Sequence, residues 1–196
     1  ITGTQIVVDK IVKYESDPFP GGWNSNVIFI ADAAGDFAAD AAQIAADYIQ
    51  TPFTSRPIYF APQTTTITAT QQVILAQWNA GAGLILYNGH SSVRQWSAAR
   101  LFHRDDVAAL ANGDRLPVVL EMTCFTGFFH DPSGTTLDES LLRAADGGAV
   151  AVWGSTGLGI STGHQQLAQG FLASVYHGGA ESIGAGALAG KLRLLQ

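Results

Sequence analysis

The chain has 196 residues, of which 47% are hydrophobic and only 13% are charged. This length suits one ordinary domain with a substantial core, and the low proportion of charges indicates that much of the chain is interior. The formal net charge is −6 and Lys and Arg do not cluster, which argues against nucleic acid and anionic membrane surfaces as partners. No apolar run approaches the roughly 18 residues that span a bilayer.

The start of the chain and its cysteine content add two observations. The chain begins at Ile1, with neither a methionine nor a signal-like segment, so we expect a processed piece of a longer protein. Its one cysteine, Cys124, cannot form an internal disulfide. The cysteine count therefore gives no information about the redox compartment.

Helices and strands are expected to alternate along the chain. Apolar residues at helical spacing predict helices over residues 4–16, 35–50, 68–81, 103–113, 135–148, 163–178 and 181–195. Runs rich in β-branched and aromatic residues predict strands over 26–31, 56–61, 83–90, 117–124 and 149–155. Such alternation is typical of right-handed βαβ units. We therefore expect an α/β fold with a mainly parallel sheet covered on both faces, as a single domain over residues 1–196.

Reactive residues stand where two consecutive predicted strands end. The run LILYNGH ends in His90 and the run VVLEMTC ends in Cys124. In open α/β sheets, binding sites form at the carboxyl ends of the strands. A free thiol has a pKa of about 8.5, so it needs a base to become a nucleophile at neutral pH. A neighbouring imidazole can take that proton and later return one to a leaving group.

A purely structural role for these residues is the alternative. Cysteine is among the most buried residue types, and a single strand cysteine is usually part of the core. A histidine at a strand end is often merely hydrogen-bonded. The remaining histidines have the sequence surroundings of ordinary surface or loop residues: His103, His130, His164 and His177. No spacing among these residues and Cys124 matches a metal site, so no metal ligand is predicted.

Small residues surround both reactive side chains. In YNGHSS a glycine precedes His90 and serines follow it, which allows a substrate backbone to approach closely. In TCFTG the thiol leads into a loop with Gly127. Backbone N–H groups in such a loop can point at a developing oxyanion.

The segments YNGHSSVRQW and MTCFTGFF resemble the caspase-like cysteine peptidases, and most closely the gingipain family of bacterial endopeptidases. In that family one strand ends in Gly-His-Gly, a Trp follows, and the next strand ends in Ala-Cys-x-x-Gly. Further segments resemble the family in the same order, so the resemblance covers most of the chain: NAGAGLILYNGHSSVRQW, LANGDRLPVVLEMTC and GGAVAVWGSTG.

The resemblance implies a three-layer, caspase-like α/β/α fold and cysteine endopeptidase activity on protein or peptide substrates. Cys124 matches the nucleophile and His90 the general acid/base. Asp32 is the nearest candidate for the acidic residue that orients the histidine. The amide of Cys124, together with an amide at Gly89 or Ser91, matches the oxyanion hole.

The resemblance also names candidate substrate contacts. Asp36 falls where arginine-specific members place a carboxylate for a basic P1 side chain, although a helix N-cap is its ordinary role. The aromatic residue that stacks on the P1 guanidinium corresponds to Ser161. Trp96 is expected first as a core or cleft-wall residue and is included among the substrate contacts. The family's glycine after the histidine is Ser91 here, and its side chain can crowd the cleft. With a buried carboxylate at Asp36 but no aromatic, we expect a weak preference for basic residues.

The family's smaller amino-terminal subdomain and its carboxy-terminal immunoglobulin-like domain have no counterpart, so the chain corresponds to the catalytic subdomain alone. The resemblance implies a secreted or cell-surface protein that requires no cofactor. A structural calcium ion enters only through the resemblance, because related peptidases often carry one. Neither nucleic acid nor membrane insertion is expected.

Two other functions compete with the peptidase. The run GSTGLG looks like a dinucleotide-binding loop, but it follows the fifth predicted strand and no acidic residue ends the next one. A catalytically degenerate, peptidase-like binding module is the other alternative. It is kept open by Ser91, where the family has glycine.

Overall fold

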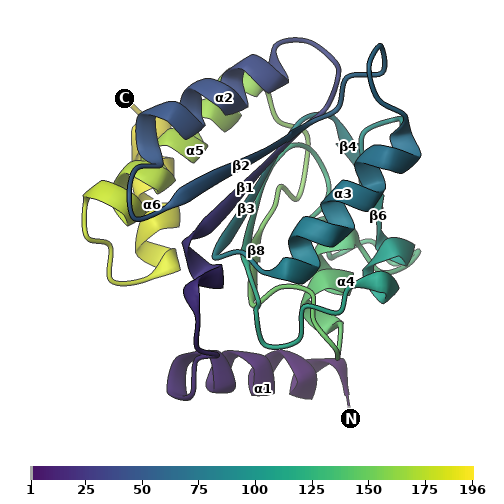
Figure 1. The fold of residues 1–196 in the computed structure, drawn as a ribbon, viewed down its shortest axis with the longest axis vertical. Coiled ribbons are helices and arrows are strands. Elements are labelled where there is room, and N and C mark those ends of the chain that lie inside the picture. The colour runs from purple at the N-terminus through teal and green to yellow at the C-terminus, as the bar shows by residue number, and fades with distance from the viewer. Residues whose placement is uncertain (1) are drawn as a thin grey trace.

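The computed structural model describes residues 2–196 and has a five-stranded sheet at its centre (Figure 1). In sequence order its strands are β1 (Asn26–Ala31), β2 (Thr54–Tyr59), β3 (Leu84–Asn88), β7 (Val118–Met122) and β8 (Ala151–Trp153). Their spatial order is β2-β1-β3-β7-β8, and every neighbouring pair is parallel. The chain builds outward from β1 to β2 and then in the opposite direction through β3, β7 and β8. The order therefore reverses between β1 and β3, which is where such sheets form sites.

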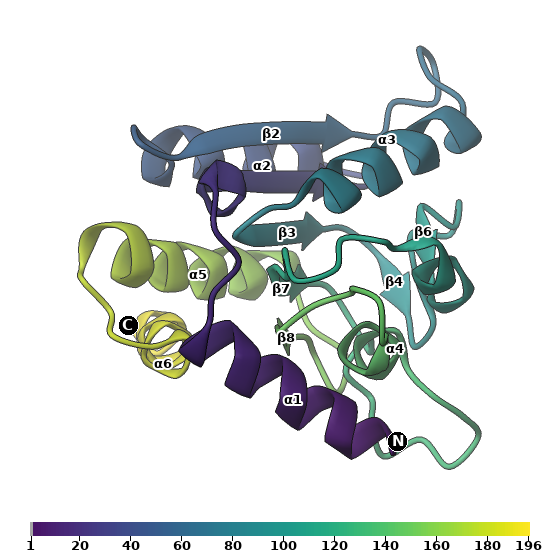
Figure 2. The ribbon, with the colours of Figure 1, turned by 60° about the horizontal axis from the view of Figure 1, so that its bottom comes forward.

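Helices cover both faces of the sheet, as the three layers in Figure 2 show. On one face lie α2 (Phe37–Tyr48), α5 (Ser161–Leu172) and α6 (Ile183–Leu194). On the other lie α3 (Ile67–Ala80) and α4 (Leu137–Arg143). The first helix, α1 (Gly3–Ser16), crosses the end of the molecule where β1 begins (Figure 1). The predicted three-layer, caspase-like α/β fold is confirmed.

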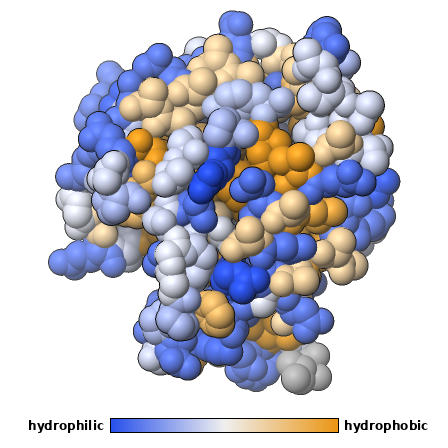
Figure 3. All heavy atoms as spheres, in the orientation of Figure 1, coloured by the Kyte–Doolittle hydropathy of each residue, from blue (hydrophilic) through white to orange (hydrophobic). Residues whose placement is uncertain are grey.

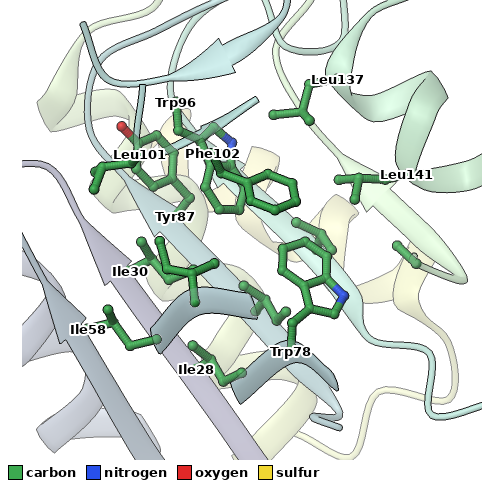
Figure 4. Close-up of a cluster of buried hydrophobic side chains, with 14 of the residues drawn as sticks. Ile28, Ile30, Ile58, Trp78, Tyr87, Trp96, Leu101, Phe102, Leu137 and Leu141 are labelled. Carbon is green, nitrogen blue, oxygen red and sulfur yellow. The ribbon is translucent and has the colours of Figure 1, made fainter. Parts of the chain in front are cut away.

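The sheet separates two hydrophobic clusters because successive strand residues point to opposite faces. The cluster under α3 and α4 contains the side chains labelled in Figure 4: Ile28, Ile30, Ile58, Trp78, Tyr87, Trp96, Leu101, Phe102, Leu137 and Leu141. The cluster under α2 and α5 includes Val27, Phe29, Leu84, Leu86, Met122 and Phe171. On the surface, polar side chains cover most of the visible face and hydrophobic ones gather near its centre (Figure 3).

A small antiparallel sheet follows β3 and was not predicted. Its strands are β4 (Ser91–Ser92), β5 (Gln95–Trp96) and β6 (Phe102–His103). The predicted helix over 103–113 is a 3₁₀ helix, η2 (Arg104–Ala109). Trp96 is 0% exposed and stacks on Tyr87 with 4.5 Å between ring centroids. Trp96 therefore anchors the small sheet on the main one, and its assignment as a substrate contact is wrong.

Four of the five predicted strands end two residues earlier than expected on the carboxyl side of the sheet, whereas β1 ends at Ala31 as predicted. The ladder between β3 and β7 stops at the pair Asn88 and Met122. His90 and Cys124 consequently lie in the loops beyond the strands. The helix predicted over 163–178 begins earlier, as α5 at Ser161, and is followed by a π-helical turn, η3 (Ala173–His177).

Candidate active site

Cys124 and His90 leave neighbouring strands at the same level. Each is the second residue after the paired Asn88 and Met122 at the ends of β3 and β7. Cys124 is half-buried and His90 is exposed. The thiol is therefore not enclosed in the core, and both residues lie at the carboxyl edge of the sheet, beside the point where the strand order reverses.

The loop after β8 holds the thiol. The Gly159 N–H points at Cys124 Sγ over 3.4 Å, and the Gly159 carbonyl oxygen lies 3.8 Å from the same sulfur. The Phe125 N–H donates to the carbonyl of Gly157 at 3.1 Å, and the Gly127 N–H donates to that of Ser155 at 3.0 Å. The loop over 154–160 thus runs beside the cysteine loop. An N–H donor aimed at the sulfur is placed to stabilise negative charge there.

His90 is held through its backbone. Its carbonyl oxygen accepts hydrogen bonds from Tyr87 Oη at 2.6 Å and from the Ser97 N–H at 2.7 Å. Burial raises the pKa of Tyr87 well above its ordinary value, which keeps the phenol protonated as a donor. The imidazole packs edge-on against Phe37, with 5.1 Å between ring centroids. Within residues 2–196 no hydrogen bond joins this ring to Cys124, so the dyad stays a prediction.

Asp32 lies beneath the histidine loop. It is 5% exposed, and its Oδ1 accepts hydrogen bonds from the Ala33 N–H at 2.7 Å and from Ser97 Oγ at 2.8 Å. Gly89 passes directly over it, since a Cβ at position 89 would come within 2.6 Å of the Asp32 Cβ. Asp32 therefore supports the loop through Ser97, and its role in orienting the ring of His90 stays a prediction.

Ser91 connects the histidine loop to the cysteine loop. Its Oγ accepts a hydrogen bond from the Cys124 N–H at 3.1 Å, and the hydroxyl also bonds to the Cys124 carbonyl. Thr123 Oγ1 lies 2.7 Å from the same Oγ and 2.6 Å from the Gly89 carbonyl oxygen. The Cys124 amide, expected as an oxyanion donor, is engaged by a hydroxyl group.

The amide of Ser91 has a different environment. Ser91 pairs with Trp96 between the antiparallel strands β4 and β5. The neighbouring pair, His90 and Ser97, is hydrogen-bonded, because the Ser97 N–H donates to the His90 carbonyl. Hydrogen-bonded and non-hydrogen-bonded pairs alternate along an antiparallel ladder, so Ser91 and Trp96 exchange no hydrogen bonds. The N–H of Ser91 therefore points away from β5 and is available to another acceptor.

The candidate P1 contacts lie at the rim of this cleft. Asp36 stands at the N-cap position of α2, but its side chain makes no capping hydrogen bond and it is exposed. It precedes Phe37, which packs on His90. Ser161, also exposed, begins α5 two residues after Gly159. The expectation of a buried carboxylate at Asp36 is wrong, because the start of α2 faces solvent.

A cavity of about 640 Å³ opens behind the loop over 154–160, between it and helices α5 and α6. His164 lines this cavity and is 9% exposed, so its assignment as a surface or loop residue is wrong. Burial lowers the pKa of its imidazole. The His164 ring reaches Gly159, where any Cβ would overlap Nε2. It therefore buttresses the loop that contacts the thiol.

A buried pair of carboxylates under the same loop was not predicted. Glu121 and Asp138 are 2% and 7% exposed, and Glu121 Oε1 accepts a hydrogen bond from Trp96 Nε1 at 2.6 Å. Glu121 Oε2, Asp138 Oδ1 and Thr126 Oγ1 make no hydrogen bond. Burial, reinforced by the charge of Glu121, holds the pKa of Asp138 well above its ordinary value. The one available sequence signal was a lone glutamate in the otherwise apolar run PVVLEM.

These oxygens converge on Gly154, the first residue of the loop. A Cβ at this position would overlap Asp138 Oδ2 and would come within 2.7 Å of Thr126 Oγ1 and 2.9 Å of Glu121 Oε2. The backbone of the loop is therefore seated directly on the carboxylate pair. Glycine is required here because no side chain fits.

Replacing Gly154 with alanine should destabilise the fold, by about 1–3 kcal/mol or more, because it overpacks a buried polar site. Gly157→Ala is the matched control in the same loop, since nothing lies within 4 Å of a Cβ there. Chemical denaturation of both variants measures the difference. Equal stabilities would contradict the proposed seating of the loop.

The raised pKa of Asp138 should make stability depend on pH. In the folded state Asp138 retains a proton that it releases in the unfolded chain, where its carboxyl group has a pKa of 3.8. Wild-type stability should therefore fall as the pH rises from that value through the folded pKa. Asp138→Asn removes this titration, so the free energy of unfolding of the variant should increase relative to that of the wild type as the pH rises from about 5 to 8.

The companion variant is Glu121→Gln, which removes the neighbouring charge. Removing this charge should lower the folded-state pKa of Asp138, so the loss of stability with rising pH should extend over a narrower pH range than in the wild type. An unchanged range would show that Glu121 does not act on Asp138. A stability difference between Asp138→Asn and the wild type that is constant with pH would contradict the assignment.

Neither a membrane span nor a metal site is found among residues 2–196. None of the helices there combines the length and apolar character that crossing a bilayer requires. No group of three or more His, Cys, Asp or Glu side chains there is placed to hold a metal ion. Calcium also takes backbone carbonyl, amide and water oxygens as ligands, so the structural calcium that the resemblance implies stays a prediction.

Three solved structures share this architecture. The Arg-specific cysteine proteinase gingipain R (RGPB) matches with a TM-score of 0.83 and 22% identity, over 98% of this chain and 47% of that one. A complex of Porphyromonas gingivalis RgpB pro- and mature domains matches with a TM-score of 0.83 and 20% identity, over 97% and 48%. A structure described as a protease matches with a TM-score of 0.80 and 18% identity, over 98% and 46%.

The chain thus spans about half the length of the solved structures that it matches. At these identities the likeness establishes the fold. No curated protein matches the chain significantly. The model of peptidase family C25 matches residues 3–196, which is nearly the whole chain. The chain belongs to peptidase family C25.

Proposed function

We propose that this chain carries the catalytic residues of a cysteine endopeptidase, with Cys124 as nucleophile and His90 as general acid/base. The observation that carries the proposal is that both residues follow the register-matched ends of β3 and β7, with Cys124 only half-buried. Membership of peptidase family C25 supports the reaction class. Protein or peptide segments are the substrates that this chemistry implies, and no cofactor is needed for it.

The reaction proceeds in two stages. The thiol proton passes to the imidazole of His90 while Cys124 Sγ bonds to the carbonyl carbon, and the carbonyl electron pair moves onto oxygen. When this oxyanion collapses, the C–N bond breaks and His90 gives its proton to the leaving amine, which leaves a thioester. Water, deprotonated by His90, then attacks the thioester, releases the carboxylate product and restores the thiol.

Other residues have supporting roles in this proposal. The N–H of Ser91 and that of Cys124 stabilise the oxyanion, and the N–H of Gly89 is the alternative donor in the histidine loop. The Gly159 N–H stabilises the thiolate. Asp32 positions the His90 loop through Ser97.

Cys124→Ala should abolish peptide hydrolysis, by about 10³-fold or more, because it removes the covalent path. His90→Ala should lose nearly as much and should also slow alkylation of the thiol by iodoacetamide. His177→Ala, another exposed histidine, is the control and should retain activity. Circular dichroism checks that each variant folds. Turnover by purified Cys124→Ala protein would locate the activity elsewhere.

The exposed carboxylate of Asp36 should give a weak preference for basic P1 residues. An exposed ion pair contributes about 0.2–1 kcal/mol, which corresponds to roughly 1.4- to fivefold in kcat/KM. Ser161 offers no ring, so no cation–π contribution separates Arg from Lys. A fluorogenic panel with Arg, Lys, Asp, Leu and Ala at P1 measures this, on the wild type, on Asp36→Asn and on Asp17→Asn as an exposed control.

In Asp36→Asn, and in the wild type at high salt, Arg and Lys should lose their advantage over Leu. Equal rates for Leu and Arg in the wild type at low salt would contradict a role for Asp36 in binding the P1 side chain. An unchanged preference for Arg and Lys in Asp36→Asn would also contradict that role.

A peptide-binding module without turnover is the second candidate. It is favoured by one observation, the engagement of the Cys124 amide by the Ser91 hydroxyl. Such a module would bind peptides without cleaving them, and Cys124→Ala would not change the affinity. The dinucleotide-binding alternative gains no support, because its GSTGLG run follows the edge strand β8 rather than β1 or β3.

A further inference from the structure

We propose that the Ser91 hydroxyl closes the oxyanion hole of the free protein and acts as a built-in brake on acylation of Cys124. The inference rests on the peptidase function proposed for this site. It concerns the side chain of Ser91, whose backbone amide is the other half of the hole. The brake is partial, because the hydroxyl can be displaced.

The Cys124 amide is already committed to another acceptor. A backbone N–H carries a single proton, and this one donates to Ser91 Oγ over 3.1 Å. The same proton cannot stabilise a substrate oxyanion until the hydroxyl moves away. In the free protein, therefore, one of the two expected donors is occupied.

The hydroxyl is held in place from several directions. Thr123 Oγ1 lies 2.7 Å from it, and Thr123 is 0% exposed and anchored to the Gly89 carbonyl. The Cys124 carbonyl is a further partner. Ser91 Oγ is thus a fixed member of the network between the two loops rather than a freely rotating surface hydroxyl.

The remaining donor is free. Because Ser91 and Trp96 form a pair that exchanges no hydrogen bonds, the Ser91 N–H points away from β5. One residue therefore offers a donor to the oxyanion and blocks its partner. An oxyanion accepts a charge-assisted hydrogen bond, which is about twice as strong as the neutral bond to a hydroxyl. The developing charge can displace the Ser91 hydroxyl, but the reaction must first break the neutral bond.

Ser91→Ala tests the brake, because it keeps the Cβ and removes only the hydroxyl. We expect kcat to rise by about three- to tenfold, the equivalent of one neutral hydrogen bond. KM should stay the same, since the gain is made in the transition state. The control is Ser92→Ala, the exposed next residue on β4, which should stay within about twofold of the wild type. Ser91→Gly is the second variant, should alanine disturb the loop.

Amide hydrogen exchange at Cys124 gives a readout that needs no catalysis. The N–H should exchange slowly in the wild type and in Ser92→Ala, and at least about tenfold faster in Ser91→Ala. Equal exchange in all three proteins would overturn the proposal, because the hydroxyl would then not hold the amide.

The kinetic outcomes separate this inference from the peptidase function. If the wild type cleaves peptides and Ser91→Ala is equally fast or slower, the brake is wrong and the peptidase stands. If none of the proteins cleaves any peptide, the peptidase function fails and the brake fails with it. If Ser91→Ala cleaves peptides and the wild type barely does, both are supported.

Discussion

The site depends on the register of one parallel ladder, the one between β3 and β7. Pairing of Asn88 with Met122 brings the two strands to an end at the same level, so the residues that follow emerge side by side. The strands are fully buried between two hydrophobic layers, and a slip of one residue would reverse which side chains face each layer. The hydrophobic core therefore sets the relative positions of the thiol and the imidazole.

A second layer of constraint comes from the small sheet and the buried carboxylates. Trp96 stacks on Tyr87 and donates a hydrogen bond to Glu121, so one side chain connects the small sheet, the main sheet and the carboxylate pair. Tyr87 in turn holds the His90 carbonyl. On the other side, Glu121 and Asp138 support Gly154 and with it the loop whose N–H meets the thiol. The apolar core and the polar site thus share residues.

The sequence was sufficient for the parallel sheet, its helical layers and the order of the strands along the chain, because buried strands and amphipathic helices leave strong periodic patterns. It was not sufficient for β4–β6, whose two-residue strands are too short to show a period. Burial of His164 and exposure of Asp36 depend on how helices sit against loops, which local pattern does not encode. The hydroxyl–amide bond between Ser91 and Cys124 joins residues 33 positions apart, so only the folded chain displays it.

Ser91 shows how such a site balances order against reactivity. Two loops that end adjacent strands have few backbone partners of their own, and the Ser91 hydroxyl supplies one by satisfying the Cys124 N–H. An oxyanion hole requires the opposite, a donor left without a partner until the transition state forms. A residue without a hydroxyl would leave that donor free and the loop less restrained, whereas serine orders the loop and occupies the donor. Stability gained inside a catalytic site is commonly offset by lost activity, and under the proposed function both effects would trace to a single oxygen atom, Ser91 Oγ.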